Sequence, residues 1–208
     1  MYKYSVFEIK TNENNAAKKN EFIKAAREKG DDYIFIHQDD IEILPNITIF
    51  EQYCKLMEDY KTSLVFYGFY KQDNRLFNGF PNPSINIKIS DTESLQIHRR
   101  ISRALIGICL KNNETLFNEN LKVYELEEYI RTIELEGKLP LGNGFFLDVP
   151  MSWESIHVKE GNFPVAYTAE MIEADKKYFT DNKINFSVES NVDALMVKIL
   201  ELRKDIKA

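Results

Sequence analysis

Cysteine is scarce in this chain of 208 residues, which contains only Cys54 and Cys109. Each lies singly inside an apolar stretch, without the paired spacing of a zinc site or a redox motif. Long apolar runs are also missing: no stretch of ~18 residues is free of charge, and the first residues contain no apolar signal segment. We therefore expect buried free thiols, no transmembrane segment and a cytoplasmic location.

An excess of positive charge is absent as well. The chain has 27 Lys and Arg residues against 33 Asp and Glu residues, for a net charge of −6. Because nucleic-acid binding depends on neutralising phosphates, we expect no nucleic-acid partner. The one basic cluster, His98-Arg99-Arg100 with Arg103, is too short for a polybasic membrane anchor. It is either a solvated face or a contact for a phosphate-bearing ligand.

Internal repeats, low-complexity tracts and linkers are missing too, which predicts one domain over residues 1–208. The N-terminal part has a strand–helix–strand pattern, with a helix closed by Gly30 and a second helix opened by Pro45. The strands expected there are 4–9, 33–36 and 64–70, and the first helix carries the apolar stripe Ala16 to Ala26.

The remaining residues predict a mixed sheet. An antiparallel strand is expected at 85–89, and 101–110 is either a strand or a short buried helix. A helix is expected from Leu126 to Leu135, stopping at Gly137, followed by a strand at 145–149. Loops are expected at 74–83 and 152–168, and an amphipathic C-terminal helix at 192–200.

An acidic cluster, His37-Gln38-Asp39-Asp40, directly follows the apolar strand 33–36. Open α/β sheets bind ligands beyond the carboxyl ends of their strands, so the position favours a ligand site. A carboxylate there can hold Mg²⁺ or Mn²⁺ together with the phosphates of a nucleotide. Asp39 is the expected ligand, and His37 can add a nitrogen. Asp40 binds with them or instead caps the following turn, as adjacent acids after a strand often do.

The run from Asp32 to Pro45 resembles the core segment of inverting nucleotide-sugar glycosyltransferases of the large family 2 type. It is similar to the branch in which His-Gln-Asp replaces the Asp-x-Asp signature. Further segments resemble that family over roughly residues 2–165: Asn15–Glu21 before the strand, Leu116–Leu121 (an "F-D-E-x-L" element), Tyr124–Arg131 (an "E-D-x-D-x-x-x-R" segment), Gly137 and the strand Phe145–Pro150.

The resemblance implies a single-domain GT-A-like α/β fold with a mixed, mostly parallel sheet flanked by helices. Residues 1–70 would form the βαβ half that holds metal and donor, and 71–168 the half with acceptor and base. Residues 169–208 would form a C-terminal helical extension. The family's first βαβ unit, which carries the nucleotide-base pocket, has no counterpart ahead of Tyr4–Ile9, so we expect an N-terminally shortened sheet. Its exposed edge would allow a homo-oligomer.

The resemblance also implies roles for individual residues. Asp39 would be the main metal ligand, His37 would take the place of the first acid of the signature, and His157 would reach the metal or diphosphate. Glu125 is preferred as the catalytic base that deprotonates the acceptor hydroxyl, with Glu127 as the second candidate. On their own, both glutamates also fit a solvated helix face.

The expected function is therefore metal-dependent transfer of a sugar, with inversion, from a nucleotide-diphosphate donor to a glycan, lipid or protein acceptor. Mn²⁺ or Mg²⁺ would stabilise the departing diphosphate. Two alternatives stay open. One is a catalytically inactive relative that binds sugars or serves in assembly. The other is nuclease or phosphatase chemistry through Asp39 and Asp40, for which the sequence shows few converging carboxylates.

Overall fold

The fold was analysed in a computed structural model of the whole chain. It describes residues 1–10, 13, 15–39, 41–43, 48–59, 64–67, 69–72, 75–78, 85–88, 94–97, 105–111, 113–135, 146–148, 156–158 and 168–184.

The chain begins with the predicted βαβ unit, β1 (Tyr4–Ile9), α1 (Ala16–Lys29) and β2 (Tyr33–Gln38). The strands pair in parallel from Tyr4 opposite Tyr33 to Ile9 opposite Gln38. Asn15 caps α1 by accepting the Lys18 N–H, and Gly30 ends the helix with φ of 74°, a left-handed conformation that glycine adopts without strain. Parallel pairing places the carboxyl ends of β1 and β2, and hence the start of α1, at one edge of the sheet.

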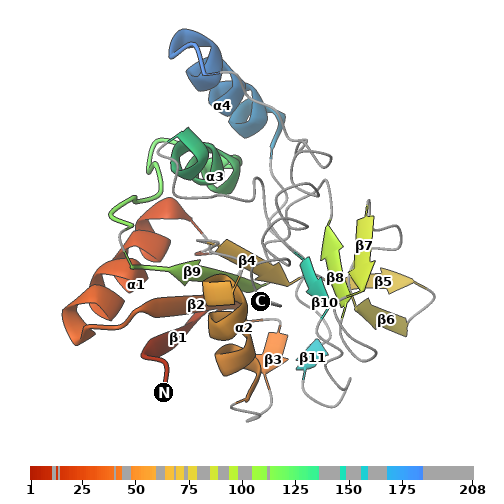
Figure 1. Cartoon of the computed structure of the whole chain (residues 1–208). Helices are drawn as coiled ribbons and strands as arrows, with labels where there is room; N and C mark the ends of the chain where they lie inside the picture. The colour runs from red at the N-terminus through yellow and green to blue at the C-terminus, as the bar shows by residue number, and fades with distance from the viewer. Residues whose placement is uncertain are drawn as a thin grey trace.

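The main sheet has seven described strands in the order β1-β2-β9-β4-β10-β8-β7 (Figure 1). The added strands are β4 (Leu64–Tyr67), β7 (Ile85–Lys88), β8 (Ser94–Ile97), β9 (Leu105–Cys109) and β10 (Phe146–Asp148). The prediction of a mixed sheet is confirmed, and the 101–110 segment supplies a strand rather than a helix. The prediction that the sheet is mostly parallel is wrong for the described pairings: β1–β2 and β4–β10 are parallel, but the other four pairs are antiparallel. The reason is that β9 runs opposite to both β2 and β4, and β8 runs opposite to both β10 and β7.

Two short strand pairs lie outside this sheet: β3 (Ile41–Ile43) with β11 (Ile156–Val158), and β5 (Phe69–Gln72) with β6 (Arg75–Asn78). They correct three predictions. The strand expected at 64–70 is two strands, the loop expected at 74–83 contains β6, and the loop expected at 152–168 contains β11. Each is only three or four residues long, so local sequence carries little signal and the pairing partner decides.

Three further helices are α2 (Thr48–Asp59), α3 (Glu125–Leu135) and α4 (Ala169–Asp181). The first two match predicted helices. The third falls in the region expected to be helical, but its position was not foreseen, and the helix predicted at 192–200 lies outside the described residues. No helix in the described part of the chain combines the length and apolar character needed to cross a membrane.

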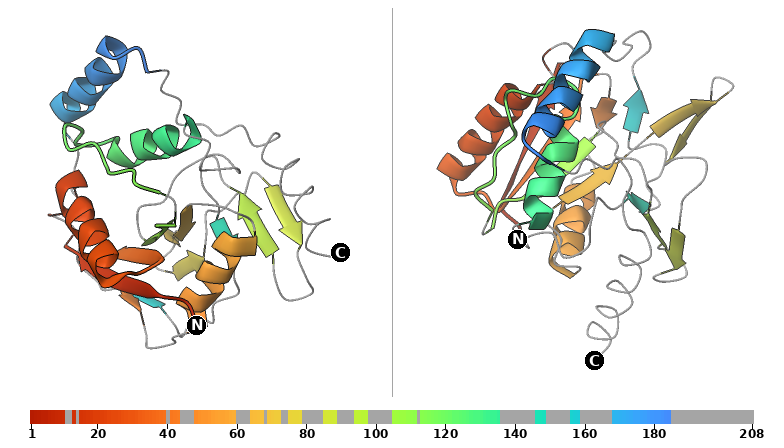
Figure 2. Two further views of the ribbon diagram at one scale, coloured as in Figure 1. Left: turned by 60° about the vertical axis from the view of Figure 1, so that its left-hand side comes forward. Right: turned by 90° about the horizontal axis from the view of Figure 1, so that it is seen from above.

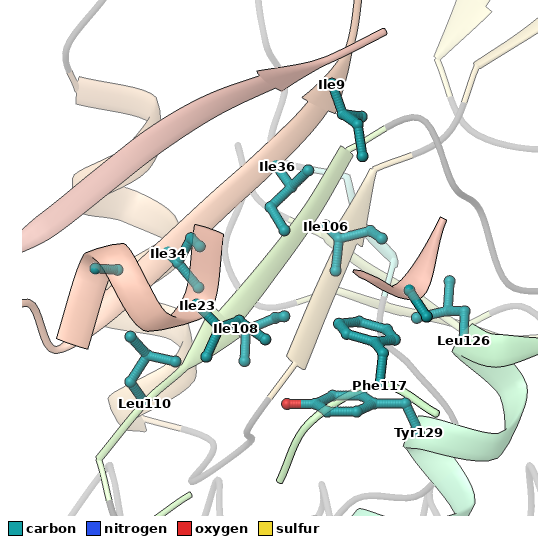
Figure 3. Packing of buried hydrophobic residues seen from close by; sticks show 12 residues of the cluster. Ile9, Ile23, Ile34, Ile36, Ile106, Ile108, Leu110, Phe117, Leu126 and Tyr129 are labelled. Atoms are coloured by element: carbon teal, nitrogen blue, oxygen red, sulfur yellow. The ribbon is translucent and has the colours of Figure 1, made fainter. Parts of the chain in front are cut away.

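Helices α1 and α2 cover opposite faces of the β1–β2 part of the sheet (Figure 2). Neighbouring residues of a strand point to opposite faces. Accordingly, the Phe7 ring stacks on Phe22 of α1, whereas Tyr4 and Phe35 contact Phe50 of α2. The main apolar cluster fills the α1 side and joins α1, β2, β9 and α3 (Figure 3). It includes Ile23, Ile34, Ile36, Ile106, Ile108, Phe117, Leu126 and Tyr129.

Candidate functional site

His37 lies near the carboxyl end of β2, between Glu8 of β1 and Leu105 of β9. The residue is 9% exposed, and its side chain, like that of Phe35, belongs to the α2 face of the sheet. The Nδ1 atom is 3.0 Å from the carbonyl oxygen of Gln38. With the proton on Nδ1 this is a hydrogen bond to the carbonyl, and the lone pair of Nε2 can bind a metal. Histidine ligands of metals are commonly oriented in this way.

Asp39 comes directly after β2, and its backbone N–H donates to the carbonyl oxygen of Ile9 at 3.0 Å. This bond extends the β1–β2 ladder by one residue and fixes the Asp39 backbone at the edge of the sheet. The Asp39 side chain is partly exposed, as a ligand-binding carboxylate needs to be. Asp40, the other acid of the cluster, lies outside the described residues.

The β3–β11 pair brings a distant part of the chain beside the segment that follows Asp39 (Figure 1). It places His157 directly opposite Glu42, which follows Asp39 by three residues. The backbone therefore carries His157 to the segment that continues from His37 and Asp39, although 118 residues separate Asp39 from His157 in the sequence. His37 and Asp39 thus lie at the carboxyl end of β2, and His157 lies in β11, which pairs with β3 in a separate two-stranded sheet.

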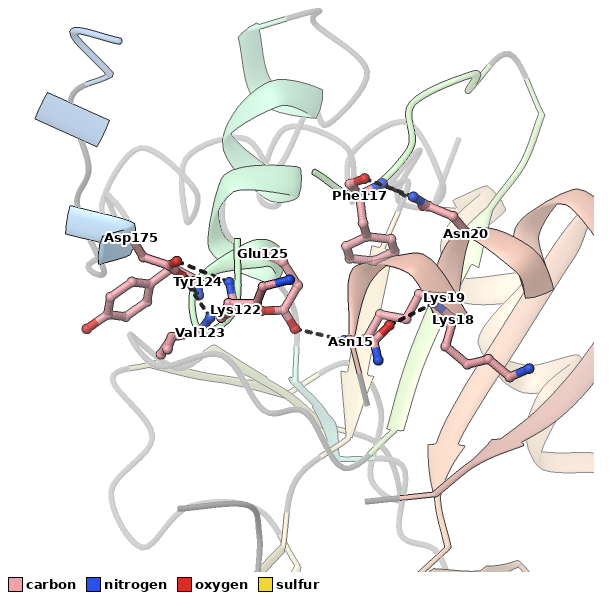
Figure 4. A network of polar contacts seen from close by, with 10 residues as sticks. All are labelled: Asn15, Lys18, Lys19, Asn20, Phe117, Lys122, Val123, Tyr124, Glu125 and Asp175. Carbon is pink, nitrogen blue, oxygen red and sulfur yellow. Dashed lines mark hydrogen bonds and ion pairs between the residues drawn. The ribbon is translucent and has the colours of Figure 1, made fainter. Parts of the chain in front are cut away.

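Glu125, the first residue of α3, is buried in an ion pair with Lys19 of α1. The Lys19 Nζ atom donates to Glu125 Oε1 at 2.8 Å, and the two side chains are only 2% and 1% exposed (Figure 4). Lys19 Nζ also lies 5.5 Å from the centre of the Phe117 ring, which adds a cation–π contact. Lys19 lies in the first turn of α1, the helix that follows the carboxyl end of β1.

Glu127 and Glu128 share the first turn of α3 with Glu125 but are partly exposed. Burial raises the pKa of Glu128, and hydrogen bonds from Thr132 and Asn118 oppose this shift in part. A raised carboxyl pKa is typical of proton-transfer sites and of structural carboxyls alike. Sequence reasoning did not select Glu128. The signal that would have found it is its place among three glutamates in one helical turn.

Sequence reasoning also missed Lys19 and Asn20, although both lie on the buried stripe of α1 between Ala16 and Ile23. Polar residues on an apolar stripe predict buried polar contacts. Asn20 makes such contacts: its Nδ2 donates to the Phe117 carbonyl at 2.9 Å, and its Oδ1 accepts the Phe117 N–H at 2.8 Å. These bonds hold the segment that leads to Glu125.

The donor types at this edge, an imidazole nitrogen and carboxylate oxygens, suit Mn²⁺ and can also serve Mg²⁺. Within the described residues, no three His, Cys, Asp or Glu side chains gather closely enough to hold a metal. His37 and Asp39 are therefore two ligands of a set that Asp40, Glu42 or His157 would have to complete. The side chains of those three residues lie outside the described part of the structure.

Comparisons with protein-family models, with curated proteins and with solved structures each found no significant match for this chain. Function is therefore inferred from the residues and from their arrangement in the fold.

Proposed function

We propose that this chain is a metal-dependent, inverting glycosyltransferase of GT-A-like fold that takes its sugar from a nucleotide-diphosphate donor. The observation that carries the proposal is the β3–β11 pairing. It places His157 opposite Glu42, in the segment that continues from His37 and Asp39 at the carboxyl end of β2. Open α/β sheets bind nucleotides beyond the carboxyl ends of their strands.

In this proposal Asp39 and His37 hold Mn²⁺ or Mg²⁺, with Asp40 and His157 as further ligands. The bound ion neutralises charge on the diphosphate as it leaves the sugar. Asp39 is partly exposed and its backbone is anchored to β1, so its carboxylate is held at the edge without being buried. The Nδ1 contact of His37 orients Nε2 for the same purpose.

The catalytic base comes from the first turn of α3 in this proposal. The resemblance prefers Glu125, but the buried ion pair with Lys19 occupies that carboxylate. A base has to come within hydrogen-bond distance of the acceptor hydroxyl. Glu127 is partly exposed and meets this requirement better, so we assign the base to Glu127. Glu125 would then hold α3 against α1.

Metal-dependent donor binding tests the proposal directly. In calorimetric titrations with Mn²⁺ and a panel of nucleoside diphosphates, the wild type should bind one of them only when Mn²⁺ is present. Asp39→Asn should weaken this binding at least tenfold. The matched control is Asp32→Asn, which removes a partly exposed carboxylate at the other end of β2 and should bind as the wild type does. If the wild type shows no metal-dependent binding of any nucleoside diphosphate, the proposal fails.

A second measurement tests the base. Glu127→Gln should abolish sugar transfer and leave Mn²⁺-dependent donor binding unchanged. If Glu125→Gln keeps the fold and Mn²⁺-dependent donor binding but abolishes transfer, while Glu127→Gln retains transfer, the assignment of the base returns to Glu125.

A second candidate function is a sugar-binding or assembly module without catalysis. The burial of Glu125 with Lys19 favours it, because the carboxylate that the resemblance prefers as the base is 1% exposed and engaged in a structural ion pair. Donor binding without transfer, unaffected by Glu127→Gln, would identify this function.

The proposed acceptor is a glycan, lipid or protein.

A homo-oligomer is also proposed, with the contact formed by β1, the terminal strand of the sheet. β1 is the last strand on its side of the described sheet, and Val6 in its middle is 38% exposed. Terminal strands with unpaired backbone groups can pair with a second chain. Sedimentation of the wild type against Val6→Lys would test this, since a charge at the middle of the strand should dissociate an oligomer formed there.

A further inference from the structure

The segment 113–124, which leads from β9 to α3, has neither helix nor strand and is held by side chains from other elements. At its middle, Asn20 of α1 pairs with both backbone groups of Phe117. Near its start, the Arg27 side chain donates to the Asn113 carbonyl at 2.6 Å. The path of this segment therefore depends on buried polar contacts rather than on backbone ladders.

Its end is held by one residue of α4. The Asp175 carboxylate accepts the backbone N–H groups of Lys122 at 3.1 Å, Val123 at 2.7 Å and Tyr124 at 2.9 Å (Figure 4). Asp175 is 1% exposed. These three residues come immediately before Glu125, where α3 begins. From a different helix, Asp175 thus holds the segment that leads into α3.

The other inward contacts of α4 fall on the same segment. The Asn118 side-chain amide donates to the Tyr178 hydroxyl at 2.6 Å, and the Phe179 ring lies 6.4 Å from that of Tyr124. Asp175 and Phe179 are the buried residues of α4. Figures 1 and 2 show the helix beyond α3, on the side away from the sheet. Helix α4 is therefore better placed to hold the start of α3 in position than to form part of the main apolar core.

We infer that Asp175 is a positioning residue: acting through the backbone of residues 122–124, it sets the first turn of α3 and so the orientation of Glu125 and Glu127. The catalytic part of this inference rests on the proposed function, in which that turn supplies the base. Asp175 itself contacts backbone amides and not the substrate. Its replacement should therefore slow the chemical step without disturbing the donor and metal residues His37 and Asp39.

Hydrogen exchange tests, independently of catalysis, whether Asp175 holds the backbone of residues 122–124. In Asp175→Asn, which keeps one acceptor oxygen, amide exchange at residues 122–124 should accelerate at least threefold. In Asp175→Ala it should accelerate at least tenfold. Glu173→Gln is the matched control, since Glu173 lies on the exposed side of α4 and forms an ion pair with the nearby Lys176. It should exchange as the wild type does. Unchanged exchange at 122–124 in Asp175→Ala would overturn the inference.

Steady-state kinetics test the positioning role. Asp175→Ala should lower kcat at least tenfold with KM for the donor and Mn²⁺ affinity within twofold of wild type, and Asp175→Asn should recover part of the rate. A purely structural role would change kcat, KM for the donor and Mn²⁺ affinity together, and that result would overturn the inference. Wild-type kcat in a variant with accelerated amide exchange at residues 122–124 would also overturn it. Absence of transfer by the wild type with every donor overturns the proposed function instead. The exchange data then decide whether Asp175 holds residues 122–124.

Discussion

The ion pair between Lys19 and Glu125 allows a quantitative test of the contact between α1 and α3. The two side chains are 2% and 1% exposed, and their charged atoms are 2.8 Å apart. Lys19→Met removes the cation and leaves the Glu125 carboxylate buried without it. Breaking a buried pair in this way costs about 3–5 kcal/mol. For a chain of this size, that corresponds to a loss of roughly 6–20 °C in Tm.

The measurement is a double-mutant cycle by urea unfolding and thermal melting. Lys19→Met and Glu125→Leu should each be strongly destabilising, while the double variant should be more stable than either, because two apolar side chains can replace a buried pair at little cost. Lys18→Met is the matched control. Lys18 is the next residue on α1 and also forms an ion pair, 2.7 Å from Glu21, but that pair is exposed. Its removal should leave Tm unchanged within error.

Two results would refute this reasoning. One is a Tm for Lys19→Met that equals that of Lys18→Met. The other is additivity, with the double variant losing the sum of the two single losses. Either result would mean that the pair is not formed in solution, and α3 would not be held to α1 by Glu125.

Three further predictions concern stability. Asn20→Asp should lower the free energy of unfolding, measured in urea, by about 3 kcal/mol. The new carboxylate cannot donate to the Phe117 carbonyl, to which Asn20 Nδ2 donates at 2.9 Å. Gly30→Ala should lower the free energy of unfolding by about 1–2 kcal/mol in the same assay. An added Cβ meets nothing within 4 Å, so the cost comes from the left-handed φ of 74° alone, and Gly30→Asn should cost less. Burial and a hydrogen bond to Glu58 raise the pKa of Tyr2 from 10.0 to about 12. A raised pKa stabilises the fold below pH 10, and this contribution is lost as the pH rises from 10 to 12, so Tyr2→Phe should flatten the fall in Tm over that range.

Sequence patterns located the elements that have strong local signals. The apolar run 33–36, the alanine-rich stripe of α1 with its cap at Gly30, and the periodic residues of α3 all match the structure. They succeed because helix periodicity, capping and continuous apolar runs are properties of neighbouring residues. Strands β3, β6, β8 and β11 escaped prediction because each has only three or four residues, and their pairing partners define them.

The candidate site likewise has residues that the local sequence predicts and contacts that only the fold determines. The cluster His37-Gln38-Asp39-Asp40 was visible because it directly follows a buried strand. The selection of Glu125 and Glu127 depended on resemblance alone, and no pattern could show that Glu125 faces Lys19, 106 residues earlier. The bonds of Asp175 to residues 122–124 likewise join segments that nothing in the local sequence connects.

By itself, then, the sequence determined an α/β chain with a βαβ start and an acidic turn at the end of its second strand. These features follow from the order of apolar, capping and acidic residues along short stretches. Only the tertiary structure decided the insertion of β9 between β2 and β4, the approach of β11 to β3, and which carboxylates are buried. Those outcomes depend on contacts between residues far apart in the chain, whose energies come from packing and desolvation in the folded state.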